Sequence, residues 1–213
     1  MKHFLISSAL LLAMGTTAGA TTISNVADEN AVINSWGSTG THFYGQTFTL
    51  GEASFLDSVL FRIDDGGVAT NFDLHVYAWN GTTTTGANLA GAGGATAGVS
   101  GMNDVSVSAG GITLGVGQFL IGYQALSGGN SQPWGAVDDD SGGFAGGEFV
   151  FQNNGGNAAS LLGGSFSTWY IEDTAFSFEL TPVAAVPLPA GGLLLMGGLG
   201  GLALARRRKQ RAV

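Results

Sequence analysis

The densest group of potential metal ligands is an acidic run in the C-terminal half of the chain. Asp138, Asp139 and Asp140 are consecutive, and Glu148 follows eight residues later. Adjacent carboxylates repel one another unless water or a cation screens them, and calcium prefers oxygen ligands of this kind. The spacing differs from the alternating ligands of an EF-hand loop. The pattern therefore predicts either a calcium site at these four residues or a solvated acidic turn.

A second acidic pair has a simpler interpretation. Asp64 and Asp65 are followed directly by Gly66 and Gly67. An Asp-Gly step favours positive φ, which tight turns require. We expect a turn at the end of a strand here, with an ion site as the alternative.

Several aromatic side chains with polar groups are candidates for binding sugars. Amphipathic rings on an exposed strand face or loop can stack against saccharide rings. We expect this role for Tyr77, Trp79 and Trp134. Sandwich cores also bury tryptophan, and Trp79, which precedes Asn80-Gly81, could instead cover the end of a hairpin.

Nucleophilic catalysis lacks its usual residues. The chain has no cysteine, and residues 21–185 contain two histidines, His42 and His75, but no lysine. Neither histidine lies in a Ser-x-x-Lys, Gly-x-Ser-x-Gly or His-Glu-x-x-His motif. His75 shares a strand face with Asp73 and Tyr77, which we interpret as a polar face rather than a catalytic site.

Glycoside hydrolysis is the enzymatic alternative. It needs two carboxylates on either side of the scissile bond. Glu148 and Glu172 could supply such a pair from neighbouring strands. We expect no catalytic residue, and a secreted carbohydrate-active enzyme is the competing hypothesis.

The elements that must position these side chains follow an alternation with a period of two. In residues 71–79, Phe72, Leu74 and Val76 point one way while the residues between them point the other, which predicts a strand with one apolar face. The same alternation predicts further strands around 59–63, 105–107, 112–116, 119–123 and 176–180, and others are expected at 47–50, 148–152 and 168–172.

Glycine-rich turn signals separate these strands. They lie at 64–67, 80–81, 109–111, 127–130 and 141–143. Residues 86–101 have few bulky side chains and predict a long surface loop or a poorly packed edge strand. We therefore expect an all-β fold over residues 21–182, an antiparallel β-sandwich of the jelly-roll kind, with an up-and-down arrangement as the alternative.

Charge is divided unevenly along the chain. All 15 Asp and Glu residues lie between residues 21 and 185, where Arg62 is the only Lys or Arg, so this stretch carries a net charge of −14. Nucleic-acid binding needs Lys and Arg to displace counterions from phosphates. We therefore expect no nucleic-acid partner.

Residues 1–20 have the three parts of a signal peptide. Lys2 supplies a charge, residues 4–14 are apolar, and Ala18-Gly19-Ala20 forms a small-x-small site. This order predicts removal by signal peptidase after Ala20. The alternative is an uncleaved membrane anchor, for which the apolar run is short.

Residues 183–213 also read as a targeting segment. Residues 190–205 are 16 uncharged residues, a helix of about 24 Å against a hydrocarbon core of about 30 Å. By the positive-inside rule, a basic end keeps its side of such a helix in the cytoplasm. The segment comprises the motif Val186, Pro187, Leu188, Pro189 and Ala190, the predicted transmembrane helix at 190–205, and the basic residues Arg206, Arg207, Arg208, Lys209 and Arg211.

This C-terminal segment resembles the PEP-CTERM class of sorting signals in its VPLPA variant. The likeness covers about residues 184–211 and consists of the motif, the Gly- and Leu-rich span and the terminal arginine cluster in that order. It implies recognition by an exosortase, a membrane-embedded cysteine transpeptidase of Gram-negative bacteria, with cleavage near the motif. It also implies an association with exopolysaccharide and biofilm. The alternative is a plain C-terminal transmembrane anchor.

Together these features predict an exported, non-enzymatic protein. We expect an intermediate anchored in the inner membrane, followed by release to the cell surface or extracellular matrix. There, the acidic domain would contribute to adhesion or bind polysaccharide, with calcium as a possible cofactor.

Overall fold

The computed structural model describes residues 19–127, 131–138, 144–169 and 171–183. The sorting motif, the predicted membrane helix, the basic end and most of the predicted signal peptide lie outside these residues. Asp139 and Asp140 also lie outside them. Within the described part, no helix is both long and apolar enough to cross a membrane.

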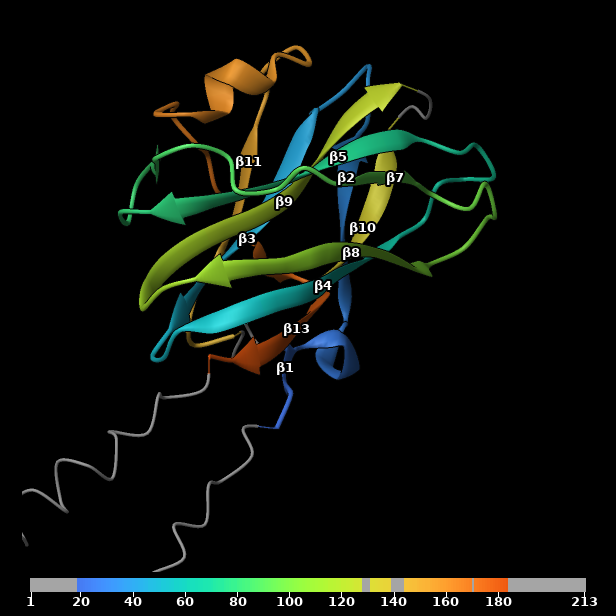
Figure 1. Cartoon of the computed structure of the whole chain (residues 1–213). Helices are drawn as coiled ribbons and strands as arrows, with labels where there is room; N and C mark the ends of the chain where they lie inside the picture. Colours follow the sequence, from blue (N-terminus) through green and yellow to red (C-terminus); the bar gives the residue numbers. More distant parts are fainter. Residues whose placement is uncertain (1–18, 128–130, 139–143, 170, 184–213) are drawn as a thin grey trace, which may run out of the picture. The chain divides into compact units, whose positions relative to one another are not determined.

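The described residues form two antiparallel sheets with almost no helix (Figure 1). The first sheet contains β1 (Thr21–Ser24), β2 (Ala31–Trp36), β4 (Ser54–Ile63), β8 (Asn103–Leu114), β10 (Gln132–Asp138), β12 (Ile171–Thr174) and β13 (Phe176–Pro182). The second contains β3 (Phe43–Leu50), β5 (Asn71–Trp79), β6 (Thr84–Thr85), β7 (Gly93–Ala95), β9 (Gly117–Ser127) and β11 (Phe149–Gln152). Two short 3-10 helices are η1 (Val26–Asp28) and η3 (Ala158–Leu161).

The chain changes sheet at most of its connections. From β2 to β5 it runs first sheet, second, first, second, and from β8 to β12 it alternates again, whereas β12 and β13 both belong to the first sheet. In the first sheet β4 pairs with β8 on one side and with β13 and β10 on the other, while β10 also pairs with β2. In the second sheet the order is β11, β3, β9, β5 and β6. This arrangement confirms the prediction of an all-β, sandwich-like fold with two antiparallel sheets.

The core between the sheets is built from alternate residues of the strands. In β5, Phe72, Leu74 and Val76 are at most 1% exposed and point inward, as their spacing predicts. Trp134 of β10 is fully buried at the centre. Its ring lies within 6 Å of four other aromatic rings, those of Trp36, Tyr44, Phe61 and Tyr123.

Tyr123 connects the two sheets by hydrogen bonds. It extends from β9 in the second sheet, and its hydroxyl lies 3.0 Å from the carbonyl oxygen of Val59 and 3.1 Å from that of Val105. Those two residues belong to β4 and β8 of the first sheet. Trp36 of β2 donates its indole N–H to the Tyr123 carbonyl at 3.2 Å. Hydrogen bonds therefore join the two sheets across the core, in addition to the apolar packing between them.

Two turn predictions have different outcomes. The predicted turn at 64–67 is confirmed, because the Asp64 carboxylate accepts the N–H of Gly66 and Gly101, both at 2.9 Å. The predicted turn at 109–111 is wrong. Gly110 and Gly111 do have positive φ, but β8 continues through them as an irregularity in its pairing with β4.

Other boundaries shift by a few residues. The strand expected at 168–172 is β12, which begins at Ile171. Strands β1, β2, β6 and β10 have no counterpart in the sequence-based prediction. Residues 86–101 are mainly irregular, but Gly93–Ala95 pairs with β5 as the short strand β7, so both features of that prediction are present.

The segment 153–169 covers part of the outer face of the second sheet, and we call it the cap. Leu161 of η3 is fully buried against Phe43, Tyr77 and Leu120 of the sheet, in a second small apolar cluster. The Thr84 hydroxyl contacts the Leu161 carbonyl and accepts the N–H of Gly163 at 3.0 Å. The cap leaves one end of this outer face open.

Candidate functional site

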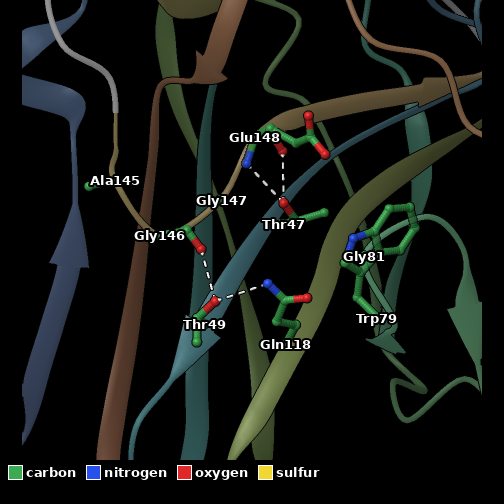
Figure 2. A pocket seen from close by; sticks show the side chains of 9 residues that line it. All are labelled: Thr47, Thr49, Trp79, Gly81, Gln118, Ala145, Gly146, Gly147 and Glu148. Carbon is green, nitrogen blue, oxygen red and sulfur yellow. Dashed lines mark hydrogen bonds between the residues drawn. The ribbon is translucent and has the colours of Figure 1, made fainter.

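An open groove of about 340 Å³ lies on the uncovered end of the outer face of the second sheet (Figure 2). Its lining comes from β3, β9, the end of β5 and the segment that leads into β11. The residues are Thr47, Thr49, Trp79, Gly81, Gln118, Ala145, Gly146, Gly147 and Glu148. We call it the Trp79 groove.

Strand alternation produces the polar floor. Phe48 and Phe119 point into the core, so their neighbours Thr47, Thr49 and Gln118 face the groove. The Gln118 amide lies 3.4 Å from the Thr49 hydroxyl, at the edge of hydrogen-bond distance. The floor therefore offers hydroxyl and amide groups to a ligand.

One wall is the backbone of residues 145–148, held against β3. The Thr49 hydroxyl donates to the Gly146 carbonyl at 3.1 Å. Thr47 accepts the Glu148 N–H at its hydroxyl at 2.8 Å and donates its own N–H to the Glu148 carbonyl at 2.9 Å. A Cβ atom at Gly147 would lie 1.7 Å from the Thr47 carbonyl oxygen, so only glycine allows this close approach.

The other wall is Trp79, the last residue of β5. It pairs with Gln118 across the ladder. The residue is 8% exposed, and its ring packs edge-on against Phe166 of the cap, with ring centroids 5.3 Å apart. Phe166 of the cap thus supports the Trp79 ring, and Trp79 itself lines the groove.

Glu148 is the only charged residue in the lining, and its side chain is exposed. Neither of the ion pairs in the described part of the chain includes it. Both belong to Arg62, whose guanidinium lies 2.6 Å from Glu29 and 3.1 Å from Asp104 in the region of the first sheet. No described cation therefore compensates the Glu148 carboxylate.

A second carboxyl group lies buried near this wall. Asp173 of β12 is 1% exposed, and burial raises its pKa to about 6. The Phe144 N–H and the Gln46 amide both donate to it and oppose that rise, while the charge of Glu148 adds to it. Asp173 is therefore part of the support of the groove and not of its surface.

The predicted sugar-binding residues separate in the structure. Trp79 lines the groove. Trp134 is fully buried in the core, so a stacking role is wrong for it. Tyr77 is 4% exposed beneath the cap, packed in the small apolar cluster, and does not line the groove either. Burial, which the strand's position in the sheet decides, explains both corrections.

Two of the four predicted calcium ligands belong to the described residues. Asp138 ends β10 in the first sheet, and Glu148 lines the groove on the second. Among the residues that the structure describes, no group of three or more His, Asp or Glu side chains is placed to hold a metal ion. Asp139 and Asp140 are outside that set, so calcium binding at the acidic run stays a prediction.

The polar face of β5 is partly enclosed. His75 is 5% exposed, and burial lowers its pKa, although the charge of Asp73 opposes this. Its Nδ1 lies 3.1 Å from the Asn88 amide nitrogen. Asp73, His75 and Asn88 line a smaller pocket beside β7. The Glu172 side chain is not described, so its pairing with Glu148 stays a prediction.

Sequence reasoning singled out Trp79 and Glu148 but missed Thr49 and Gln118, for which strand alternation is the only signal. Comparisons with protein-family models, with curated proteins and with solved structures gave no match.

Proposed function

We propose that this chain is an exported, non-enzymatic surface or extracellular-matrix protein that binds polysaccharide in the Trp79 groove. The observation that carries the proposal is the lining itself. An aromatic wall at Trp79 faces a floor of threonine hydroxyls and the Gln118 amide in an open groove. Aromatic rings pack against the apolar faces of sugars, and hydroxyl and amide groups bond sugar hydroxyls.

We also propose that the sandwich is a jelly roll. The pairings support this, because β2, β10, β4 and β8 neighbour one another in that order in one sheet. In the other sheet β3, β9, β5 and β6 do so. Lectin domains are among the proteins with this topology, which supports the proposed binding function.

The proposed route to the surface uses both ends of the chain. Signal peptidase would cut after Ala20, and β1 begins at the next residue, Thr21. An exosortase would act near Val186, shortly after β13 ends at Pro182. These positions support the route, since neither cut would remove a strand of the described sandwich.

Glycan binding tests the function directly. We expect the residue 21–183 domain to bind one or more glycans on an array, and Trp79→Ala to weaken that binding about tenfold or more through loss of the stacking wall. Thermal unfolding of the variant checks that it remains folded. Release of reducing sugar from a bound glycan would instead favour the glycoside hydrolase hypothesis.

Mass spectrometry of surface material tests the route. We expect a mature protein that begins at Thr21 and lacks residues 206–211. A surface-exposed protein that still carries Arg206–Arg211 would contradict sorting by cleavage and would indicate a permanent C-terminal anchor.

A further inference from the structure

We infer that the Trp79 groove selects oligosaccharides with free amino groups, such as glucosamine polymers, over their N-acetylated counterparts. Glu148 would pair with a sugar ammonium while Trp79 stacks against another ring of the same chain. This inference rests on the proposed function, because it names the class of polysaccharide that the groove would take.

The size of the groove favours an oligosaccharide. The lining residues come from four strands that are neighbours in the second sheet. Glu148 directly precedes β11, the threonines lie on β3, Gln118 on β9 and Trp79 on β5. At about 4.8 Å between strands, three spacings make about 14 Å, which is longer than one sugar ring. Figure 2 shows the threonines and Gln118 along the floor between the two walls. A ligand that reaches both walls must therefore contain more than one sugar.

Backbone contacts hold Glu148 in place. Both its N–H and its carbonyl oxygen are bonded to Thr47, at 2.8 and 2.9 Å. Its side chain is exposed and makes none of the hydrogen bonds or ion pairs found among the described residues. A fixed backbone with an exposed, uncompensated carboxylate is suited to a charged hydrogen bond with an ammonium, which is stronger than a neutral one.

The negative charge around the groove argues against anionic sugars as ligands. The buried Asp173 carboxyl feels the charge of Glu148, so the two lie close enough to interact. The single cation of residues 21–185, Arg62, is paired with Glu29 and Asp104. A uronate or sulfate group in this groove would meet a carboxylate and no described cation. A neutral N-acetyl group would gain no ion pair.

The test compares two ligands that differ only in acetylation. Oligomers of glucosamine and of N-acetylglucosamine, of equal length, are titrated into the domain by calorimetry at an ionic strength of about 0.15 M. We expect the free-amine oligomer to bind about tenfold more tightly, because it adds one charge-assisted contact. Glu148→Gln should remove that preference by weakening binding of the free-amine oligomer about tenfold.

A matched control separates a local contact from general attraction to an acidic protein. Glu179→Gln removes one carboxylate from β13 in the first sheet, where Glu179 accepts a hydrogen bond from Thr22 at 2.9 Å. It changes the net charge by the same amount as Glu148→Gln, and we expect it to leave both affinities unchanged. If it weakens free-amine binding as much as Glu148→Gln does, the inference is wrong.

Other outcomes separate the two proposals. Equal binding of both oligomers, lost in Trp79→Ala, would overturn the amino-group selectivity and leave the proposed function standing. Preferential binding of a uronate polymer in the presence of calcium would overturn the amino-group selectivity, and would indicate that a calcium ion bridges the polymer and the groove. Absence of binding to every glycan tested would overturn both.

Discussion

Asp173 gives the domain a pH-dependent contact between its sheets. Its carboxyl accepts hydrogen bonds from the Gln46 side-chain amide and the Phe144 N–H, while the Thr174 N–H donates to the side-chain oxygen Oε1 of Gln46 at 3.0 Å. Gln46 belongs to the second sheet and Asp173 to the first. Because burial raises the pKa of Asp173 from 3.8 to about 6, the folded protein binds this proton more tightly than the unfolded chain does.

This shift has a defined sign. A raised folded-state pKa contributes stability that is fully present below about pH 3.8 and is lost as the pH rises through about 6. The contribution is at most about 3 kcal/mol from a shift of about two pKa units. We expect the free energy of unfolding of the native protein to fall relative to that of Asp173→Asn between about pH 4 and 6, measured by urea denaturation. A pH-independent difference would contradict this.

Residue type alone identified only part of the groove. Trp79 and Glu148 could be singled out from their residue types, because an aromatic ring can stack on a sugar and a carboxylate can bind a cation. Thr49 and Gln118 are ordinary residues for any outward strand face, so nothing in their type distinguishes them. Trp79 and Trp134 look alike in sequence, and only the phase of each strand decides that one lines a groove and the other fills the core.

At the scale of elements, the cap determines how firmly the groove is built. Leu161 is fully buried against the sheet, while the adjacent Leu162 is 52% exposed. We expect Leu161→Ala to lower the free energy of unfolding by about 2 to 3 kcal/mol, since it leaves a cavity in the small cluster. It should also speed proteolysis within residues 153–169. Because Phe166 of the cap packs against Trp79, a loosened cap should also weaken glycan binding. Leu162→Ala is the matched control.

The expected results distinguish the two leucines by unfolding midpoint, cleavage rate and affinity. Leu162→Ala should change all three little, because an exposed side chain loses few contacts. If the two variants behave alike, the cap is not held by Leu161. If Leu161→Ala loosens the cap but leaves affinity unchanged, the cap does not support the Trp79 wall.

Alternation predicted the strands that are regular and failed where the pairing is irregular. The strand at 71–79 was predicted with its observed bounds because its apolar face is unbroken. In β10, Pro133 lies at a shift in the pairing with β2, and Gly135 lies beneath the Glu29 carboxylate, where a Cβ would be 2.8 Å from it. Proline and glycine obscure the alternation, so β10 could not be recognised. The contacts that explain Pro133 and Gly135 are with residues distant in the sequence, so no local sequence pattern indicates them.

At the scale of the whole molecule, the net charge of −14 over residues 21–185 opposes the compact state. Salt screens repulsion between exposed carboxylates, with a screening length that falls from about 30 Å at 0.01 M to about 8 Å at 0.15 M. We therefore expect the melting temperature to rise by several degrees between these concentrations of sodium chloride. A constant or falling melting temperature would show that the carboxylates are already compensated.

Adding calcium at matched ionic strength separates screening from binding. A rise beyond that with sodium chloride, reversed by chelator, would support the predicted site at Asp138–Asp140 and Glu148. Replacing Asp138 by Asn should then reduce the calcium-specific rise and leave the sodium chloride effect intact.

The position of β13 has a mechanical consequence. This strand pairs with β4 from Phe176 to Pro182 and with β1 along Thr21–Ser24 on its other side. If the protein is held by its C-terminal end, fluid drag enters the domain through β13. A pull along this strand must shear two hydrogen-bonded ladders at once instead of peeling one edge strand away. The residues that signal peptidase would leave as the new N-terminus would then act as a brace on the strand that bears the load.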